Sequence, residues 1–329
     1  MEIFRTLVSP PLSTKKINYS SKVMLLGSCF SDYMADKLVK SKFIVNNNPF
    51  GIVYNPLSVN FQLEKLMKGD EYTPDNLFLS DGVWCSYEHH SRFSNIDKEA
   101  CLENMNQNLQ RSRHFLESTD LLFLTFGTSY VYYLKDSNKV VSNCHKIAAR
   151  EFDRKKVTVQ EIVSIYDALI QKLIQFNPNA FVVFTVSPIR HWKDGAHENQ
   201  LSKAILLLAI EELCGHHPNT IYFPSYEILM DDLRDYRFYA EDMLHPNSVA
   251  IQYIWEQVKY SFMLPETLLI MKDVDKIVQA RNHRPFSSQT EAFQSFVRQF
   301  YEKIQYLKEH YKISFENEEK YFESFLVNK

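Results

Sequence analysis

Short apolar segments alternate with longer amphipathic segments along most of this chain, and this alternation restricts the fold more than any other feature. Four apolar segments have the length of buried strands, and the segments between them carry apolar residues at helical spacing. The predicted strands cover residues 22–27, 120–127, 181–187 and 220–223. The predicted helices cover residues 33–40, 57–68, 97–117, 158–175, 199–213 and 247–262. Strands that alternate with helices form βαβ units, so the pattern predicts an α/β fold with a mostly parallel sheet covered on both faces.

Glycine is scarce, which gives weight to the positions where it occurs. The chain has seven glycines among 329 residues, and two of them, Gly27 and Gly127, end predicted strands. Glycine is favoured where a side chain would not fit or where the backbone needs a positive φ. Ligands of open parallel sheets bind beyond the carboxyl ends of the strands. We therefore expect the functional site in the loops that follow these strands.

The domain organisation follows from a change in the sequence near residue 265. Residues 130–134 and 139–141 flank a turn and are predicted to form a β-hairpin. Residues 287–329 are charged and aromatic without a strand pattern, which is typical of long amphipathic helices. We expect an α/β domain over residues 1–264 and a helical C-terminal extension over residues 265–329. The extension packs either on the domain or on a partner. If the partner is a second copy of the chain, the C-terminal helices form a homodimer.

Charge and composition exclude several classes of protein. A net charge of -3 argues against charge-driven binding to nucleic acid. The sequence lacks the uncharged apolar stretch of about 18 residues that a membrane span requires. The first 20 residues lack the apolar block of a secretory signal. Five cysteines without CxxC spacing indicate reduced thiols, so we expect a cytoplasmic protein that contacts neither membrane nor nucleic acid.

The turn after the first predicted strand carries Gly27, Ser28 and Cys29. A nucleophile at this place gains from the free N–H groups of the following helix, which stabilise a thiolate or an oxyanion. Ser31 or Asp32 is predicted to cap that helix. The alternative is a small-residue turn with a buried, inert cysteine.

Two other segments carry groups that complement a nucleophile. Asp242 precedes His245 by three residues, and such a carboxylate can fix the tautomer of the imidazole and stabilise its charged form. Asn247 is predicted to cap the next helix. Gly127 and Ser129 follow the second predicted strand and present N–H and hydroxyl donors for an oxyanion. A structural histidine and a plain strand end are the alternatives.

The order of these three segments resembles the SGNH (GDSL-type) hydrolase superfamily, and more closely its GSCFA branch. The Gly-Ser-Cys-Phe-Ala motif of that branch corresponds to residues 27–31, which read Gly-Ser-Cys-Phe-Ser. Four further stretches are similar to the family: residues 48–56, 143–146, 187–191 and 236–246. The resemblance covers about residues 3–262. It implies a three-layer α/β/α fold with a flavodoxin-like strand order.

The resemblance also implies roles for individual residues. It places Cys29 at the nucleophile position, Ser28 where the superfamily has Asp, Asp242 as the orienting carboxylate and His245 as the general base. Ser28 as the nucleophile, or neither residue, remain alternatives. We also expect a Cys29 thiolate near neutral pH if the helix terminus and the imidazolium lower its pKa.

The remaining predicted site residues are donors and pocket walls. The resemblance makes Gly51 the counterpart of the oxyanion-hole glycine and puts Ser129 where an Asn amide usually donates. Arg190 and His191 follow the third predicted strand, where a contact to a substrate anion is expected. Cys144 and His145, which follow the hairpin, are expected to form a wall of the pocket. Asn55, within the family-like stretch 48–56, is expected to contact substrate.

The function that the resemblance implies is hydrolysis of ester bonds in a bacterial cytoplasm. The expected substrate is a small-molecule or carbohydrate ester, with a carbohydrate O-acyl ester as one candidate. No metal and no organic cofactor are expected. Two alternatives stay open: a catalytically silent binding module on the same fold, and acyl transfer to a sugar or peptide.

Overall fold

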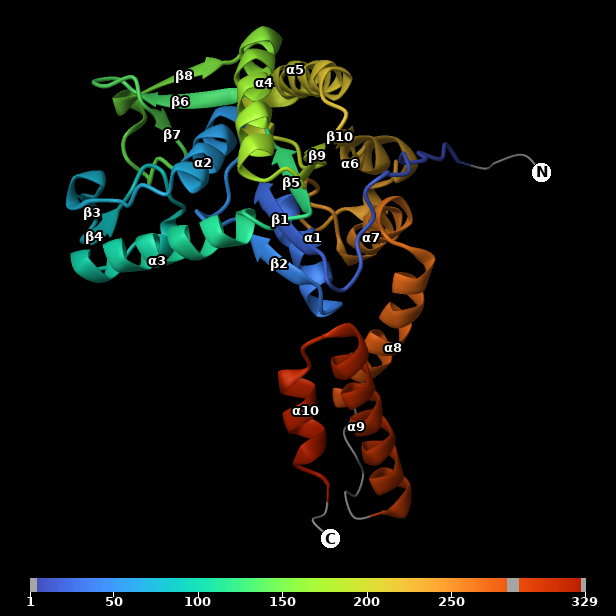
Figure 1. The fold of residues 1–329 in the computed structure, drawn as a ribbon. Coiled ribbons are helices and arrows are strands. Elements are labelled where there is room, and N and C mark those ends of the chain that lie inside the picture. Colours follow the sequence, from blue (N-terminus) through green and yellow to red (C-terminus); the bar gives the residue numbers. More distant parts are fainter. Residues whose placement is uncertain (1–4, 283–289, 327–329) are drawn as a thin grey trace.

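The computed structural model describes residues 5–282 and 290–326. A five-stranded sheet lies at its centre (Figure 1), and all of its pairings are parallel. Across the sheet the strands follow the order β10 (Thr220–Tyr222), β9 (Phe181–Val186), β5 (Leu121–Phe126), β1 (Lys22–Gly27) and β2 (Ile44–Asn47). Renumbered within the sheet, this is the flavodoxin-like order 2-1-3-4-5. The predicted α/β fold is therefore confirmed.

Helices cover both faces of the sheet and make three layers. Side chains alternate along β1, so that Val23 and Leu25 enter one apolar cluster while Met24 and Leu26 enter another. The first cluster is covered by α1 (Cys29–Lys40), α7 (Ser248–Phe262) and α8 (Pro265–Arg281). The second is covered by α2 (Pro56–Lys68), α3 (Lys98–Leu116), α4 (Val159–Phe176) and α5 (Gly195–His216). All six predicted helices are present.

Smaller elements surround this frame. The predicted hairpin is present as β6 (Tyr130–Leu134) and β7 (Val140–Val141), and β8 (Phe152–Lys156) extends it to three strands. A second hairpin pairs β3 (Phe78–Ser80) with β4 (Val83–Cys85). The helix α6 (Ser225–Glu227) continues as a π-helical turn, Ile228–Asp232. Single 3₁₀ turns lie at Pro74–Asn76, Ser91–Phe93, Ala149–Glu151, Trp192–Asp194 and Tyr236–Phe238.

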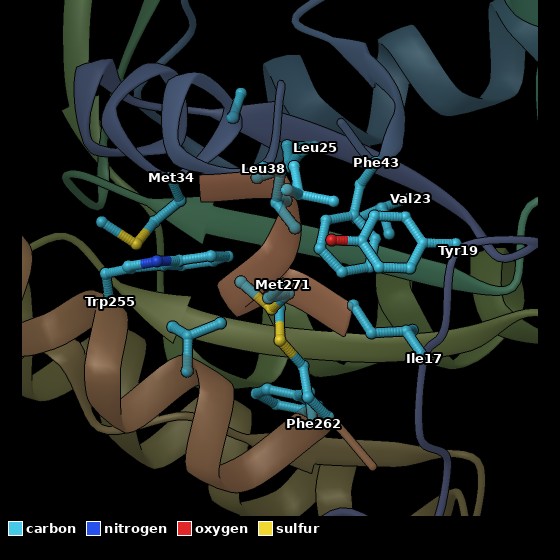
Figure 2. Close-up of a cluster of buried hydrophobic side chains, with 14 of the residues drawn as sticks. Ile17, Tyr19, Val23, Leu25, Met34, Leu38, Phe43, Trp255, Phe262 and Met271 are labelled. Carbon is cyan, nitrogen blue, oxygen red and sulfur yellow. The ribbon is translucent and has the colours of Figure 1, made fainter. Parts of the chain in front are cut away.

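The segment before β1 runs along the corner between α7 and α8. The Ile17 N–H donates to the Phe262 carbonyl at 2.8 Å, and the Thr267 hydroxyl donates to the Ile17 carbonyl at 3.4 Å. Figure 2 shows the Ile17 side chain in the same apolar cluster as Phe262 and Met271. This segment therefore joins the first strand to helices that follow it by some 250 residues in the chain.

The C-terminal helices add apolar side chains to the first cluster, which α1 and α7 also cover. Helix α9 (Glu291–Tyr311) and α10 (Glu316–Glu323) lie side by side and extend away from the sheet (Figure 1). Glu318 is buried and pairs with Lys42 at 2.7 Å and with Arg281 at 3.9 Å. The helical extension is thus confirmed, while the boundary between residues 264 and 265 and the homodimer stay predictions.

The strand order fixes where a site can form. β1 lies between β2 and β5, so the chain leaves β1 toward one side of the sheet and returns on its other side. The loops that follow β1 and β5 diverge at this point, and such a divergence opens a crevice at the carboxyl edge of a parallel sheet.

No helix within residues 5–282 and 290–326 combines the length and the apolar character that crossing a membrane requires.

Candidate active site

The turn after β1 requires glycine. Gly27 has φ of +138°, and a Cβ atom at this position would lie 2.1 Å from the Thr125 carbonyl oxygen of β5. The Ser28 N–H donates to that same oxygen at 3.2 Å. Gly27 thus allows β1 and β5 to approach closely, and Ser28 and Cys29, which follow it, lie at the crevice.

Ser28 and Cys29 have different structural roles in this turn. Ser28 is the N-cap of α1, and its hydroxyl accepts the Phe30 N–H at 3.3 Å. The prediction that Ser31 or Asp32 caps this helix is therefore wrong, because the helix begins at Cys29, earlier than the apolar spacing indicated. Cys29 is the first helical residue and is partly exposed.

Asn48 fixes the turn from the other side and was not identified from the sequence. Its side-chain oxygen accepts the Gly27 N–H at 2.8 Å, and its side-chain N–H donates to the Asp32 carboxylate at 2.7 Å. Asn48 is fully buried. It therefore holds the Asp32 carboxylate close to Cys29.

The loop before α7 brings Asp242 and His245 together. One Asp242 oxygen accepts the N–H groups of Leu244 at 3.0 Å and His245 at 2.9 Å. The other oxygen lies 2.5 Å from His245 Nδ1. These hydrogen bonds lower the pKa of Asp242 to about 2, so the carboxylate is charged at neutral pH. Asn247 caps α7, which confirms its prediction.

The nucleophile candidate and the histidine meet across the crevice. Cys29 Sγ lies 3.9 Å from His245 Nε2, although 216 residues separate them in the chain. Both side chains line a cavity of about 290 Å³ at the carboxyl edge of the sheet. Its walls are Ser28, Cys29, Tyr54, Ser187, Ile189, Arg190, His191, Trp192, Lys193, Leu244 and His245.

The thiol of Cys29 is protonated at neutral pH. Burial, followed by the negative charge of Asp32, raises the pKa of Cys29 to about 11, although helix N–H groups and Lys203 act in the opposite direction. The expectation of a thiolate near neutral pH is therefore wrong. Any nucleophilic attack by Cys29 needs a base to take its proton, and His245 is placed for that task.

The backbone N–H of Gly51, the predicted oxyanion donor, already donates to another group of the protein. Its N–H donates to the Asn48 carbonyl at 2.7 Å, within a turn where Gly51 has φ of +88°. A Cβ atom there would lie 2.1 Å from the Cβ of His90. The turn geometry explains the glycine, and it leaves this N–H unavailable to an oxyanion.

The predicted donor groups of Gly127 and Ser129 are also hydrogen-bonded within the protein. The Gly127 N–H donates to the Tyr54 carbonyl at 2.7 Å. The N–H and hydroxyl of Ser129 lie 2.8 and 3.0 Å from the Ser202 hydroxyl, and Ser129 is fully buried. The Cys29 N–H, at the first position of α1, has no acceptor within the described parts of the chain apart from its own thiol.

Three other predicted residues lie outside the walls of this cavity. His145 donates through Nε2 to the Ser86 carbonyl at 2.8 Å, so it fixes a loop, and its neighbour Cys144 lies in that loop. Asn55 caps α2, where its side chain accepts the Ser58 N–H at 2.8 Å. Hydrogen bonding within the protein, rather than contact with a ligand, accounts for His145 and Asn55.

Arg190 and His191 do line the cavity, as the sequence indicated. His191 packs edge-on against the ring of Tyr54, with ring centroids 5.3 Å apart. Burial, followed by the positive charge of Lys203, lowers the pKa of His191 to about 4, so its ring is neutral at physiological pH. Tyr54 and Trp192 are cavity residues that the sequence analysis did not single out.

Lys203 is a fully buried cation directly behind the cavity. Its ammonium donates to the carbonyls of Gly127 and Ser187, each at 2.7 Å. These two carbonyls follow neighbouring strands, β5 and β9, so Lys203 holds their ends together at the site. No carboxylate pairs with it among residues 5–282 and 290–326. Burial, with a smaller effect from the positive charge of Arg190, lowers the pKa of Lys203 to about 7, while Cys29 acts in the opposite direction.

A sequence signal for Lys203 exists in α5. It shares a helical face with Leu206, Ile210 and Leu213, all of which are buried. A lysine in phase with such an apolar stripe is buried with the stripe, and buried lysines need a specific reason to be there.

Among the described residues, no three His, Cys, Asp or Glu side chains approach one another closely enough to hold a metal ion.

Comparison with known proteins gives a family match and several structural neighbours. The model of the GSCFA family matches residues 22–258, and that of the GSCFA domain protein, C-terminal domain, matches residues 274–328. No curated protein matches the chain.

Several of the structural neighbours are esterases. A carbohydrate esterase family 3 protein from Talaromyces cellulolyticus is 10% identical over 77% of this chain and 99% of its own, with a TM-score of 0.34. A family 3 carbohydrate esterase from Clostridium thermocellum is 10% identical over 78% and 98%, with a TM-score of 0.34. An acetyl xylan esterase from Butyrivibrio proteoclasticus is 12% identical over 73% and 63%, with a TM-score of 0.37. Scores of this size support no conclusion about activity.

Proposed function

This chain belongs to the GSCFA family, and from that premise we propose that it hydrolyses ester bonds with Cys29 as the nucleophile. The observation that carries the proposal is the alignment of Cys29, His245 and Asp242. Sγ lies 3.9 Å from Nε2 of the imidazole, whose Nδ1 lies 2.5 Å from the carboxylate. Nucleophile, base and orienting group are thus in the order that covalent acyl transfer requires.

In the first half of the reaction, Cys29 Sγ attacks the acyl carbon while its proton moves to His245 Nε2. Because the thiol is neutral at rest, attack and proton transfer are coupled. The carbonyl electron pair becomes an oxyanion near the Cys29 N–H and the N-terminus of α1, whose dipole favours negative charge. When the intermediate collapses, the ester C–O bond breaks and His245 returns the proton to the leaving alcohol.

In the second half, water attacks the thioester on Cys29. His245 takes a proton from this water, the C–S bond breaks, and the thiolate recovers the proton from His245 as the carboxylic acid leaves. Asp242 stays ionised throughout and stabilises the imidazolium in both halves. A cavity of about 290 Å³ suits a short acyl group, and a small-molecule or carbohydrate ester fits this proposal.

The test is turnover of p-nitrophenyl acetate, with the intact protein mass recorded during turnover. We expect wild type to carry an acyl adduct that disappears in Cys29→Ala. Asp242→Ala and His245→Ala should lower turnover by about 10²-fold or more while the fold is retained. Full activity in His245→Ala would refute the mechanism.

Two control variants separate the nucleophile from its surroundings. Cys144→Ala removes another partly exposed thiol and should keep full turnover, because that thiol lies outside the cavity walls. Ser28→Ala removes the α1 cap and should cost about 1 kcal/mol of stability while the adduct persists. Loss of the adduct in Ser28→Ala alone would make Ser28 the nucleophile.

Two observations favour a catalytically silent binding module instead. The N–H groups of Gly51, Gly127 and Ser129 are all occupied, and the Cys29 thiol is protonated at neutral pH. Absence of both adduct and turnover in wild type, across p-nitrophenyl acetate and butyrate, would support this second function.

A further inference from the structure

A second cavity opens directly beside the first. Its volume is about 420 Å³, and it shares Arg190, Trp192 and Leu244 with the cavity that holds Cys29. Asp242 is one of its walls. A substrate with its carbonyl at Cys29 would therefore extend into this second cavity, past the His245–Asp242 pair.

Arg190, at the junction of the two cavities, lacks a counter-ion. No carboxylate pairs with its guanidinium in the parts of the chain that the structure describes. Its neighbours are the Met230 sulfur, 3.1 Å from Nη2, the Tyr226 phenol, to which it is hydrogen-bonded, and the Trp192 ring, whose centroid lies 6.0 Å from the guanidinium carbon. The Nε atom is buried and has no hydrogen-bond acceptor within the protein. Burying a cationic donor without an acceptor is costly, so the site is incomplete as it stands.

The Arg190 guanidinium lines both cavities, and a guanidinium has the geometry that a carboxylate matches. Nε has no acceptor, and Nη2 contacts only a thioether, which is a weak acceptor. A carboxylate can bind a guanidinium through two parallel hydrogen bonds. The second cation nearby is Lys203, which Arg190 repels, so an anion at this place would relieve unfavourable charge.

The acidic groups of this cavity are already engaged. Asp242 accepts from His245, and Asp235 pairs with Arg237 at 3.8 Å. Arg234, the other arginine of the cavity, is paired with Asp231 at 3.2 Å. Arg190 is thus the arginine of this cavity that is free to receive a ligand carboxylate.

Aromatic side chains give the cavity flat apolar walls. Trp192 and Tyr236 are 50% and 74% exposed, and Tyr239 lies beside Tyr236 with ring centroids 5.9 Å apart. Exposed aromatic faces in a cavity bind the flat or apolar face of a ring. A guanidinium that can donate to a carboxylate, next to such walls, suits an acid that is carried on a ring.

We propose that this second cavity binds a ring-borne carboxylate, so that the substrate of the Cys29 site is an O-acyl ester of a hydroxy acid of about monosaccharide size, whose own carboxylate stays free and pairs with Arg190. The claim that the bound acid is part of a substrate rests on the proposed function. The binding site itself does not depend on turnover.

The experiment measures protection of Cys29 from alkylation. Wild type is treated with iodoacetamide at about pH 9 with D-glucuronate or benzoate, and with the uncharged D-glucose or benzamide as matched controls. The rate of Cys29 modification is followed by peptide mass spectrometry. We expect the two acids to slow modification and the two neutral compounds to leave it unchanged.

Arg190→Met should require an about tenfold or higher acid concentration for the same protection, because a charge-assisted pair is lost. Arg190→Lys should restore protection only in part, since a lysine cannot bind both carboxylate oxygens in parallel. Arg234→Met, the matched control at the same cavity, should retain it. Each variant is compared with its own rate without acid.

Equal protection by neutral compounds, no protection by either acid, or unchanged protection in Arg190→Met would each overturn the proposal. Because alkylation needs only the thiol, these outcomes are separate from a failure of ester turnover. An enzyme that turns over p-nitrophenyl acetate but shows no acid protection keeps the proposed function and loses the carboxylate site.

Discussion

Replacing Lys203 by Met should change how the stability of the protein depends on pH. Burial lowers the pKa of Lys203 from 10.5 to about 7, so the unfolded chain binds a proton between these values that the folded chain does not. The stability that Lys203 contributes is present above pH 10.5 and is lost as the pH falls toward about 7. The full difference corresponds to about 5 kcal/mol, or about 1.4 kcal/mol per pH unit.

The assay is urea unfolding of wild type and Lys203→Met from about pH 7.5 to about pH 9.5. Over this interval the stability of wild type relative to the variant should rise by roughly 2–3 kcal/mol. The variant also leaves the Gly127 and Ser187 carbonyls without their donor, which costs about 1–3 kcal/mol each at every pH. That cost shifts the curve of the variant downward without changing its slope.

Lys272→Met is the control, because Lys272 is exposed on α8. Its stability should stay parallel to that of wild type across the same pH range. A difference in the free energy of unfolding between wild type and Lys203→Met that stays constant with pH would show that Lys203 titrates like an exposed lysine. The conclusion that burial lowers its pKa would then be wrong.

Three further predictions concern the turn, the extension and the thiol. Gly27→Ala should destabilise the fold by more than about 2 kcal/mol in urea unfolding, since its Cβ would lie 2.1 Å from a β5 carbonyl oxygen. Glu318→Gln should speed hydrogen exchange in α10, because it breaks a buried charge pair worth about 3–5 kcal/mol, whereas Glu302→Gln on the exposed face of α9 should not. Alkylation of Cys29 should accelerate about tenfold per pH unit up to about pH 11, because burial raises its pKa, and a plateau near pH 8 would contradict this.

The central sheet could be predicted because its buried strands are continuous apolar segments. β2 was missed because it is an edge strand with exposed and half-buried residues, so it lacks that signal. β8 was missed because its sequence, Phe-Asp-Arg-Lys-Lys, is charged and pairs outside the central sheet. Apolar periodicity therefore reports burial, and it fails where a strand is not buried.

The site could be predicted only in part, for a related reason. The spacing of Asp242 and His245 is local, so their contact could be expected from the sequence. The availability of a backbone N–H is often not local: Gly127 and Ser129 lost theirs to Tyr54 and Ser202, which only the folded chain brings near, whereas Gly51 donates within its own turn. The pKa of Cys29 depends on burial and on Asp32, which Asn48 holds in place, so its sign could not be derived from the motif.

The contact between Ile17 and the α7–α8 corner has a consequence for synthesis on the ribosome. Thr267 follows Ile17 by 250 residues, so at about 5–20 residues per second the partner of this segment emerges roughly 12 to 50 s later. During that interval the β1 face that carries Val23 and Leu25 lacks the cover of α7 and α8. For most of its elongation the nascent chain therefore presents an apolar sheet face that α1 covers without α7 and α8, and that face is where a chaperone would be expected to bind.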